Sequence, residues 1–97
     1  MKAMADTALS TELIAKVHQL FPQDPELVLG ALQSECRSEL GNELGERVRC
    51  AVLKLSQGSL ERLSSALDLA RRDWRDVLVG AGFAEDLDIH KSWLRAK

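Results

Sequence analysis

The sequence predicts an all-α protein, a single compact orthogonal bundle of five to six short helices. Among the 97 residues, 17 Leu and 11 Ala stand against 2 Ile and 6 Val. Leu and Ala lose little conformational freedom in a helix, whereas β-branched residues lose more. Apolar residues also recur at helical spacing between Gly and Pro residues, and no stretch alternates over enough residues to indicate a strand.

The first two helices begin at clear N-terminal signals. Ser10 or Thr11 can cap a helix that Pro22 ends. The Asp24-Pro25 pair starts the second helix, because it supplies a capping oxygen and a residue that needs no N–H. Gly41 suits the position after the second helix, where a residue in the left-handed conformation is common. The expected inward residues are Leu13, Ile14, Val17, Leu20 and Phe21, then Leu27, Val28, Ala31, Leu32, Cys36 and Leu40.

The third helix has the clearest amphipathic pattern. Asn42 can cap it and Gly58 ends it. Its expected inward residues, separated by four, three, one and three positions, are Leu44, Val48, Ala51, Val52 and Leu55. Leu53 falls outside this stripe and is expected at the surface.

Three shorter helices complete the bundle. Ser59 caps the fourth, and Asp73 restarts the chain into a fifth, with Asp76 as its capping-box-like partner. Gly82 ends the fifth, and an acidic link over 85–88 leads to the last. The expected inward residues are Leu60, Leu63, Ala66, Leu67 and Ala70, then Trp74, Val77, Leu78 and Ala81, then Ile89, Trp93 and Leu94.

Size and charge limit what the domain can do. At this length folding buries only about 60 to 65% of the chain's surface, which leaves little room for a deep active site. We expect a flexible lead over 1–9 and one helical domain over 10–97. The formal net charge of −2 gives no global cationic field, so nucleic acid is disfavoured as a partner. No segment resembles a membrane span or signal peptide, so we expect a cytoplasmic protein without a membrane partner.

No arrangement of residues indicates catalysis or metal binding. Cys36 and Cys50 lie 14 positions apart, without the His or Cys spacing of a zinc site. We expect buried thiols, with a disulfide between them as the alternative. His18 and His90 lie near opposite ends of the chain, and no HExxH, GxSxG, Walker or GxGxxG pattern is present. We expect a non-enzyme with no catalytic residues, cofactor or metal.

The segment 60–79 also has the frame of a helix-turn-helix DNA reader. Its positive charges are Arg71, Arg72 and Arg75. Against this interpretation, Asp68, Arg72 and Asp76 follow at intervals of four, and such residues pair with one another along a helix. Nucleic-acid binding through the three arginines is therefore the alternative hypothesis.

Two resemblances concern different parts of the chain. Leu20-Phe21-Pro22, followed by Pro25, Leu29, Ala31 and Leu32 and later by the segment 46–53, resembles a CUE domain, a three-helix ubiquitin-binding module. That resemblance implies a binding surface made of Phe21, Pro22, Val52 and Leu53. It provides a second alternative, a ubiquitin-binding module.

The second resemblance covers more of the chain. The segment 47–55, then Gly58, then 70–83 with the string Asp73-Trp74-Arg75-Asp76-Val77-Leu78, resembles a family of short uncharacterised bacterial proteins. It implies a stand-alone helical domain of bacterial origin and no mechanism. Within this motif, a buried or half-buried Arg75 paired with an acidic group such as Asp73 or Glu61 would fix how the fourth and fifth helices cross.

We therefore expect a non-enzymatic protein-interaction or accessory domain that binds a partner protein or a second copy of itself. The candidate surface consists of apolar residues that the helical stripes leave outside or that lie near the C-terminus. These residues are Leu29, Leu53, Val79, Trp93 and Leu94. Trp93 is the best anchor because tryptophan is enriched at interface hot spots, although it could instead close the core.

Overall fold

The computed structural model describes residues 9–35, 42–85 and 88–96, and within these ranges the fold is all-α, as predicted. The helices are α1 (Thr11–Leu20), α2 (Pro25–Glu35), α3 (Asn42–Ser56), α4 (Leu60–Ala81) and α5 (Ile89–Arg95). The expectations for the lead over 1–8 and for Cys36, Leu40 and Gly41 lie outside the described residues. None of the described helices is long and apolar enough to cross a membrane.

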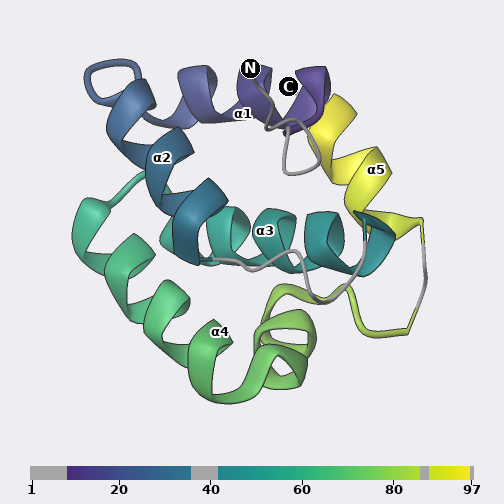
Figure 1. Cartoon of the computed structure of the whole chain (residues 1–97). Helices are drawn as coiled ribbons and strands as arrows, with labels where there is room; N and C mark the ends of the chain where they lie inside the picture. The colour runs from purple at the N-terminus through teal and green to yellow at the C-terminus, as the bar shows by residue number, and fades with distance from the viewer. Residues whose placement is uncertain (1–8, 36–41, 86–87, 97) are drawn as a thin grey trace, which may run out of the picture.

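Helix α3 lies at the centre of the bundle. Figure 1 shows it crossing the middle, with α1 above, α4 below, and α2 and α5 at the two sides. Its most extensive contacts are with α4. The buried residues of α3 cover every side of the helix and are Gly45, Arg47, Val48, Arg49, Cys50, Ala51, Val52, Leu53 and Ser56.

The amphipathic pattern expected for α3 is therefore wrong outside its apolar stripe, where Leu53 and the two arginines on either side of the stripe are buried. Arg47 Nη2 donates a hydrogen bond of 2.6 Å to the Phe83 carbonyl, and Arg49 Nε donates one of 3.2 Å to the Leu32 carbonyl. Leu32 lies in the last turn of α2, where helix carbonyls lack intrahelical donors. Each buried guanidinium thus meets a main-chain acceptor from another segment, which offsets part of the cost of its burial; Arg47 Nε itself has no hydrogen-bond partner among the described residues.

Most helix boundaries follow the local signals in the sequence. Ser10 Oγ accepts from the Leu13 amide at 3.2 Å, so Ser10 and not Thr11 is the N-cap of α1. Ser59 Oγ accepts from the Arg62 amide at 3.3 Å, which confirms the N-cap predicted there. Gly82 ends α4 in the left-handed conformation, with φ of 80°. The predicted inward residues Leu27, Leu60 and Ile89 are exposed instead, because each lies in the first turn of its helix, at the edge of the bundle.

Helix α4 contains a sharp bend at Asp73. The backbone there leaves the helical region, with φ of −158° and ψ of 90°, and Asp73 Oδ1 accepts from the Arg75 amide at 3.1 Å. The predicted fourth and fifth helices are thus a first arm (60–72) and a second arm (74–81) of one bent helix. Figure 1 shows the chain turning back at the bottom of α4.

Two glycines should respond to alanine in opposite directions. Gly58 has φ of 79°, and an added Cβ would lie 3.3 Å from the Leu20 carbonyl oxygen, so Gly58→Ala should destabilise the fold by about 1–2 kcal/mol. Gly30 lies inside α2 with open space around it, so Gly30→Ala should stabilise it by about 0.5–1 kcal/mol. Urea denaturation of both variants checks this; shifts of the same sign would contradict the backbone assignment.

Candidate protein-binding groove

The five residues expected to form a binding surface do not lie on one surface. Leu53 is 0% exposed, so the expectation that it faces outward is wrong, and Leu94 is buried, in agreement with its expected inward position in the last helix. Leu29 and Trp93 are half-buried and pack against the core. Only Val79, at 64% exposure, projects fully into solvent. Four of the five residues therefore belong to the core or pack against it.

The surface implied by the CUE resemblance is also inside the protein. Phe21, Val52 and Leu53 are buried, and of its four residues only Pro22 is exposed. Val52 and Leu53 lie on α3, which the other helices surround. A ubiquitin-binding surface of the expected composition is thus not available in this fold.

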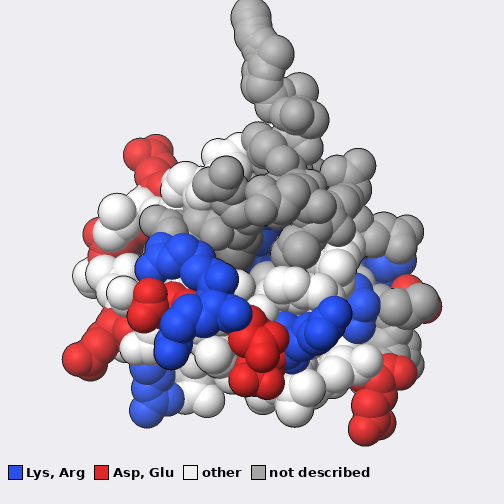
Figure 2. Space-filling view, turned by 60° about the horizontal axis from the view of Figure 1, so that its bottom comes forward, with Lys and Arg blue, Asp and Glu red and all other residues white. Residues whose placement is uncertain are grey.

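The three arginines of the nucleic-acid hypothesis are exposed on α4, but acidic side chains accompany them. Arg71 Nη2 lies 2.6 Å from Asp68 Oδ1, and this contact lowers the pKa of the Asp68 carboxyl. The predicted pairing of Asp68 with Arg72 is thus replaced by one with Arg71, one position earlier. Figure 2, in which the bottom of Figure 1 comes forward, shows Lys and Arg intermixed with Asp and Glu on the face where α4 lies. Phosphate binding requires an excess of positive charge, which this mixture does not favour.

Arg75 is exposed, so the expectation of a buried or half-buried Arg75 is wrong. Its guanidinium carbon lies 5.2 Å from the centre of the Trp74 ring, a cation–π contact. Asp73 accepts from the backbone amide of Arg75 rather than from its guanidinium. The bend of α4 is thus fixed by a main-chain cap, and Arg75 is not needed to hold the two arms together.

An open apolar groove of about 250 Å³ lies between the last turn of α3 and the first arm of α4. Its lining residues are Leu55, Arg62, Ser65, Ala66 and Leu69. The four residues from α4 are spaced i, i+3, i+4 and i+7, so they share one face of that helix. Ala66 is buried, Leu55 and Leu69 are half-buried, and Arg62 and Ser65 are exposed. The groove therefore has apolar walls and a polar edge.

Two further contacts define the borders of the groove. The Arg62 guanidinium donates to Gln57 Oε1, and this hydrogen bond holds the positively charged guanidinium at the edge of the groove. An added Cβ on Gly80 would lie 3.6 Å from Leu55 Cδ2, so the second arm of α4 borders the same leucine. Val79 is the residue before Gly80 and is the most exposed of the large apolar side chains in the described residues.

The described residues contain no group of three or more His, Cys, Asp or Glu side chains that could hold a metal ion. Cys50 is a buried free thiol, and burial raises the pKa of that thiol above its ordinary value, which removes nucleophilic character. The chain matches no protein-family model, no curated protein and no solved structure.

Sequence reasoning identified part of this groove. Leu55 and Ala66 were expected to be inward-facing, while Ser65 had no assigned role. The i, i+3, i+4, i+7 spacing of the α4 residues was visible in the sequence. What the sequence did not show is that the end of α3 leaves this face partly uncovered.

Proposed function

We propose that this chain is a non-enzymatic protein-interaction domain that receives an apolar side chain of a partner protein in the groove between α3 and α4. The supporting observation is the groove itself, in which half-buried Leu55 and Leu69 remain reachable from solvent above a buried Ala66. An apolar centre with a polar edge is the composition of protein interfaces. The exposed Arg62 and Ser65 supply that edge.

The dimensions of the groove favour a side chain over a small molecule. Its volume of about 250 Å³ is below the roughly 300–1,000 Å³ typical of ligand pockets. An amphipathic helix of a partner presents apolar anchors that fill such depressions one or two at a time. Arg62, held by Gln57, favours a partner with a carboxylate next to its apolar anchor, because charged hydrogen bonds fix orientation.

A photo-crosslinking amino acid placed at Ser65 tests this proposal. Ser65 lines the groove, whereas Ser64 is exposed on the same arm of α4 but does not line it. Irradiation of the cells that make the protein should give a discrete protein adduct from position 65 and none from position 64. Mass spectrometry identifies the adduct, and an adduct of twice the chain mass identifies a second copy.

Competition provides the matched control. An excess of unlabelled wild-type protein should suppress the adduct at least tenfold, and Ser64→Trp should compete as well as wild type. Ser65→Trp should not compete, because the indole occupies the groove without removing a core contact. Equal adducts from positions 64 and 65, or full competition by Ser65→Trp, would reject the groove as the binding site.

A further inference from the structure

Helix α5 is the element of the described fold that depends most on contacts with other helices. It has only seven residues, and helices of this length are not stable alone in water. The side chain of Asp88 at its N-cap makes no capping hydrogen bond among the described residues, and lies 3.3 Å from Lys91 Nζ in an ion pair. The position of α5 therefore depends on contacts with α1 and α3.

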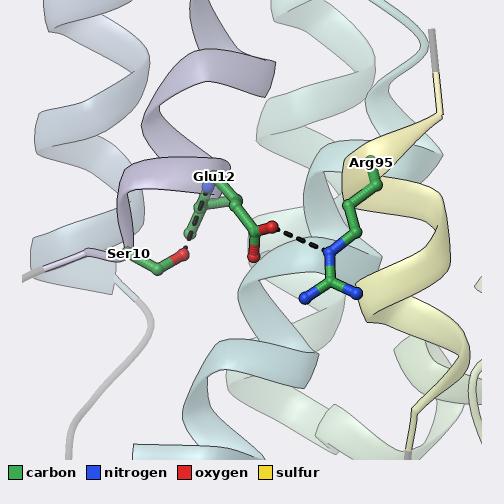
Figure 3. A network of polar contacts seen from close by, with 4 residues as sticks. Ser10, Glu12 and Arg95 are labelled. Carbon is green, nitrogen blue, oxygen red and sulfur yellow. Dashed lines mark hydrogen bonds and ion pairs between the residues drawn. The ribbon is translucent and has the colours of Figure 1, made fainter.

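The C-terminal end of α5 is held by α1. Lys16 Nζ donates to the Ala96 carbonyl at 2.7 Å and lies 4.9 Å from the centre of the Trp93 ring. Arg95 Nε donates to Glu12 Oε2 at 2.9 Å, and Figure 3 shows this pair bridging the start of α1 and the end of α5. The ion pair is largely exposed, so it contributes little to holding the helix.

The side of α5 that carries His90 and Trp93 packs on Phe83, which is 0% exposed. The His90 ring meets Phe83 edge-on at 6.4 Å between centroids, and the Trp93 ring lies at 6.1 Å. Lys54 Nζ of α3 lies 5.0 Å from the centre of the same Phe83 ring. Phe83 thus joins α5 to α3 through ring contacts.

His90 is the unusual member of this cluster. It is 3% exposed, and its Nδ1 is buried without a hydrogen-bond partner among the described residues. A neutral imidazole can leave one nitrogen without a proton, whereas the imidazolium carries an N–H on both. Protonation in place would therefore either bury an unpaired N–H or require α5 to move, and a buried unpaired charged donor is costly.

The charged groups around His90 act in both directions. Glu46 on α3 and Asp88 on α5 favour its protonated form, while Arg47 on α3 and Lys91 on α5 oppose it. Burial outweighs the two carboxylates, so the pKa of His90 is lowered from its ordinary value near 6.5. From α1, Lys16 and Glu12 contact Trp93 and Arg95, at the other end of the helix.

We propose that α5 is a pH-sensitive latch, which protonation of His90 releases from α1 and α3, uncovering Phe83 and freeing Trp93 and Leu94. The groove between α3 and α4 has no part in this proposal, which stands independently of it. In the released state the two C-terminal residues that the sequence marked as anchors become accessible to a partner.

The direction of the pH dependence follows from linkage. Above the ordinary histidine pKa, His90 is neutral whether α5 is closed or released, and the latch stays closed. As the pH falls below about 6.5 the released state binds a proton more readily than the closed one, so the ratio of released to closed protein rises by up to about tenfold per pH unit. The rise stops once the pH is below the lowered pKa of the closed state.

Amide hydrogen exchange at pH 7.5, 6.5 and 5.5 tests the latch. Protection factors of the amides of Lys91, Ser92 and Ala96, which bond within α5, should fall by up to about tenfold per pH unit below 6.5, while those of α3 stay constant. His90→Phe keeps the ring contact with Phe83 and should abolish the fall. His18→Gln, at an exposed histidine of α1, should leave it unchanged.

Glu46→Gln provides a second variant that is independent of substitution at His90. Removing this carboxylate removes a group that favours protonated His90, so the loss of α5 protection between pH 6.5 and 5.5 should become larger. Wild-type protection that does not change with pH, an equal loss in α3, or a fall that persists in His90→Phe would overturn the proposal.

Discussion

Replacing Phe83 with alanine is expected to destabilise the fold by about 3–5 kcal/mol, a large part of the 5–15 kcal/mol typical of a domain. Phe83 is the largest of the fully buried side chains, and its ring contacts His90 and Trp93 of α5 as well as the Lys54 ammonium. Truncation would leave a cavity where α3 and α5 meet. Because α5 is also held by α1, through Lys16, little of that cavity can be closed by movement of α5 without breaking those contacts.

Urea denaturation of Phe83→Ala measures this loss through the midpoint and slope of unfolding. Phe83→Leu is the matched control, because it keeps most of the apolar volume and should cost roughly half as much or less. Hydrogen exchange should also show α5 losing protection before α3 does. A cost below about 1 kcal/mol for Phe83→Ala would mean that α5 does not pack on this ring.

The parts of the fold that could be predicted from the sequence are those determined within one helical turn. Ser10 and Ser59 each cap an amide three positions later, and Gly82 supplies the left-handed residue at the end of α4. The bend at Asp73 is equally local, because its carboxylate accepts from an amide two positions away. Such capping requires no knowledge of the rest of the chain.

The burial of α3 could not be predicted in this way. Arg47 and Arg49 lie outside the apolar stripe that the sequence predicts, and the acceptors of their hydrogen bonds lie 36 and 17 positions away in the chain. A charged residue is tolerated inside only when such an acceptor is present, and the acceptor is supplied by tertiary structure. Periodicity within one helix therefore underestimates how many sides of a central helix are covered.

The same limit applies to the groove and to Trp93. The groove depends on how far the end of α3 covers one face of α4, which is a property of two packed helices. For Trp93 the sequence left both core closure and partner binding open. The structure places Trp93 half-buried beside Phe83 and Lys16, so in the closed bundle its ring packs against the core.

Leu53→Ala and Val79→Ala test the burial that the structure gives these residues. Helical periodicity in the sequence predicts that both residues lie at the surface, whereas the structure buries only Leu53. Leu53 is 0% exposed on central α3, so its truncation should cost about 2–5 kcal/mol. Val79 projects from the second arm of α4, and its truncation should change stability by less than about 0.5 kcal/mol. Both variants remove only apolar atoms from a helix and introduce a good helix former, so helix propensity does not explain a large difference between them.

Urea midpoints of the two variants, measured side by side, decide between these descriptions of α3. A large loss for Leu53→Ala alone means that α3 is covered on the side that carries Arg49, which lies four positions before Leu53. Equal, small losses would mean that this side faces solvent, and the hydrogen bond from Arg49 to the Leu32 carbonyl would then have to be absent as well. Because Leu53 and Arg49 share one buried side of α3, a single hydrophobic truncation also tests a polar contact of the central helix.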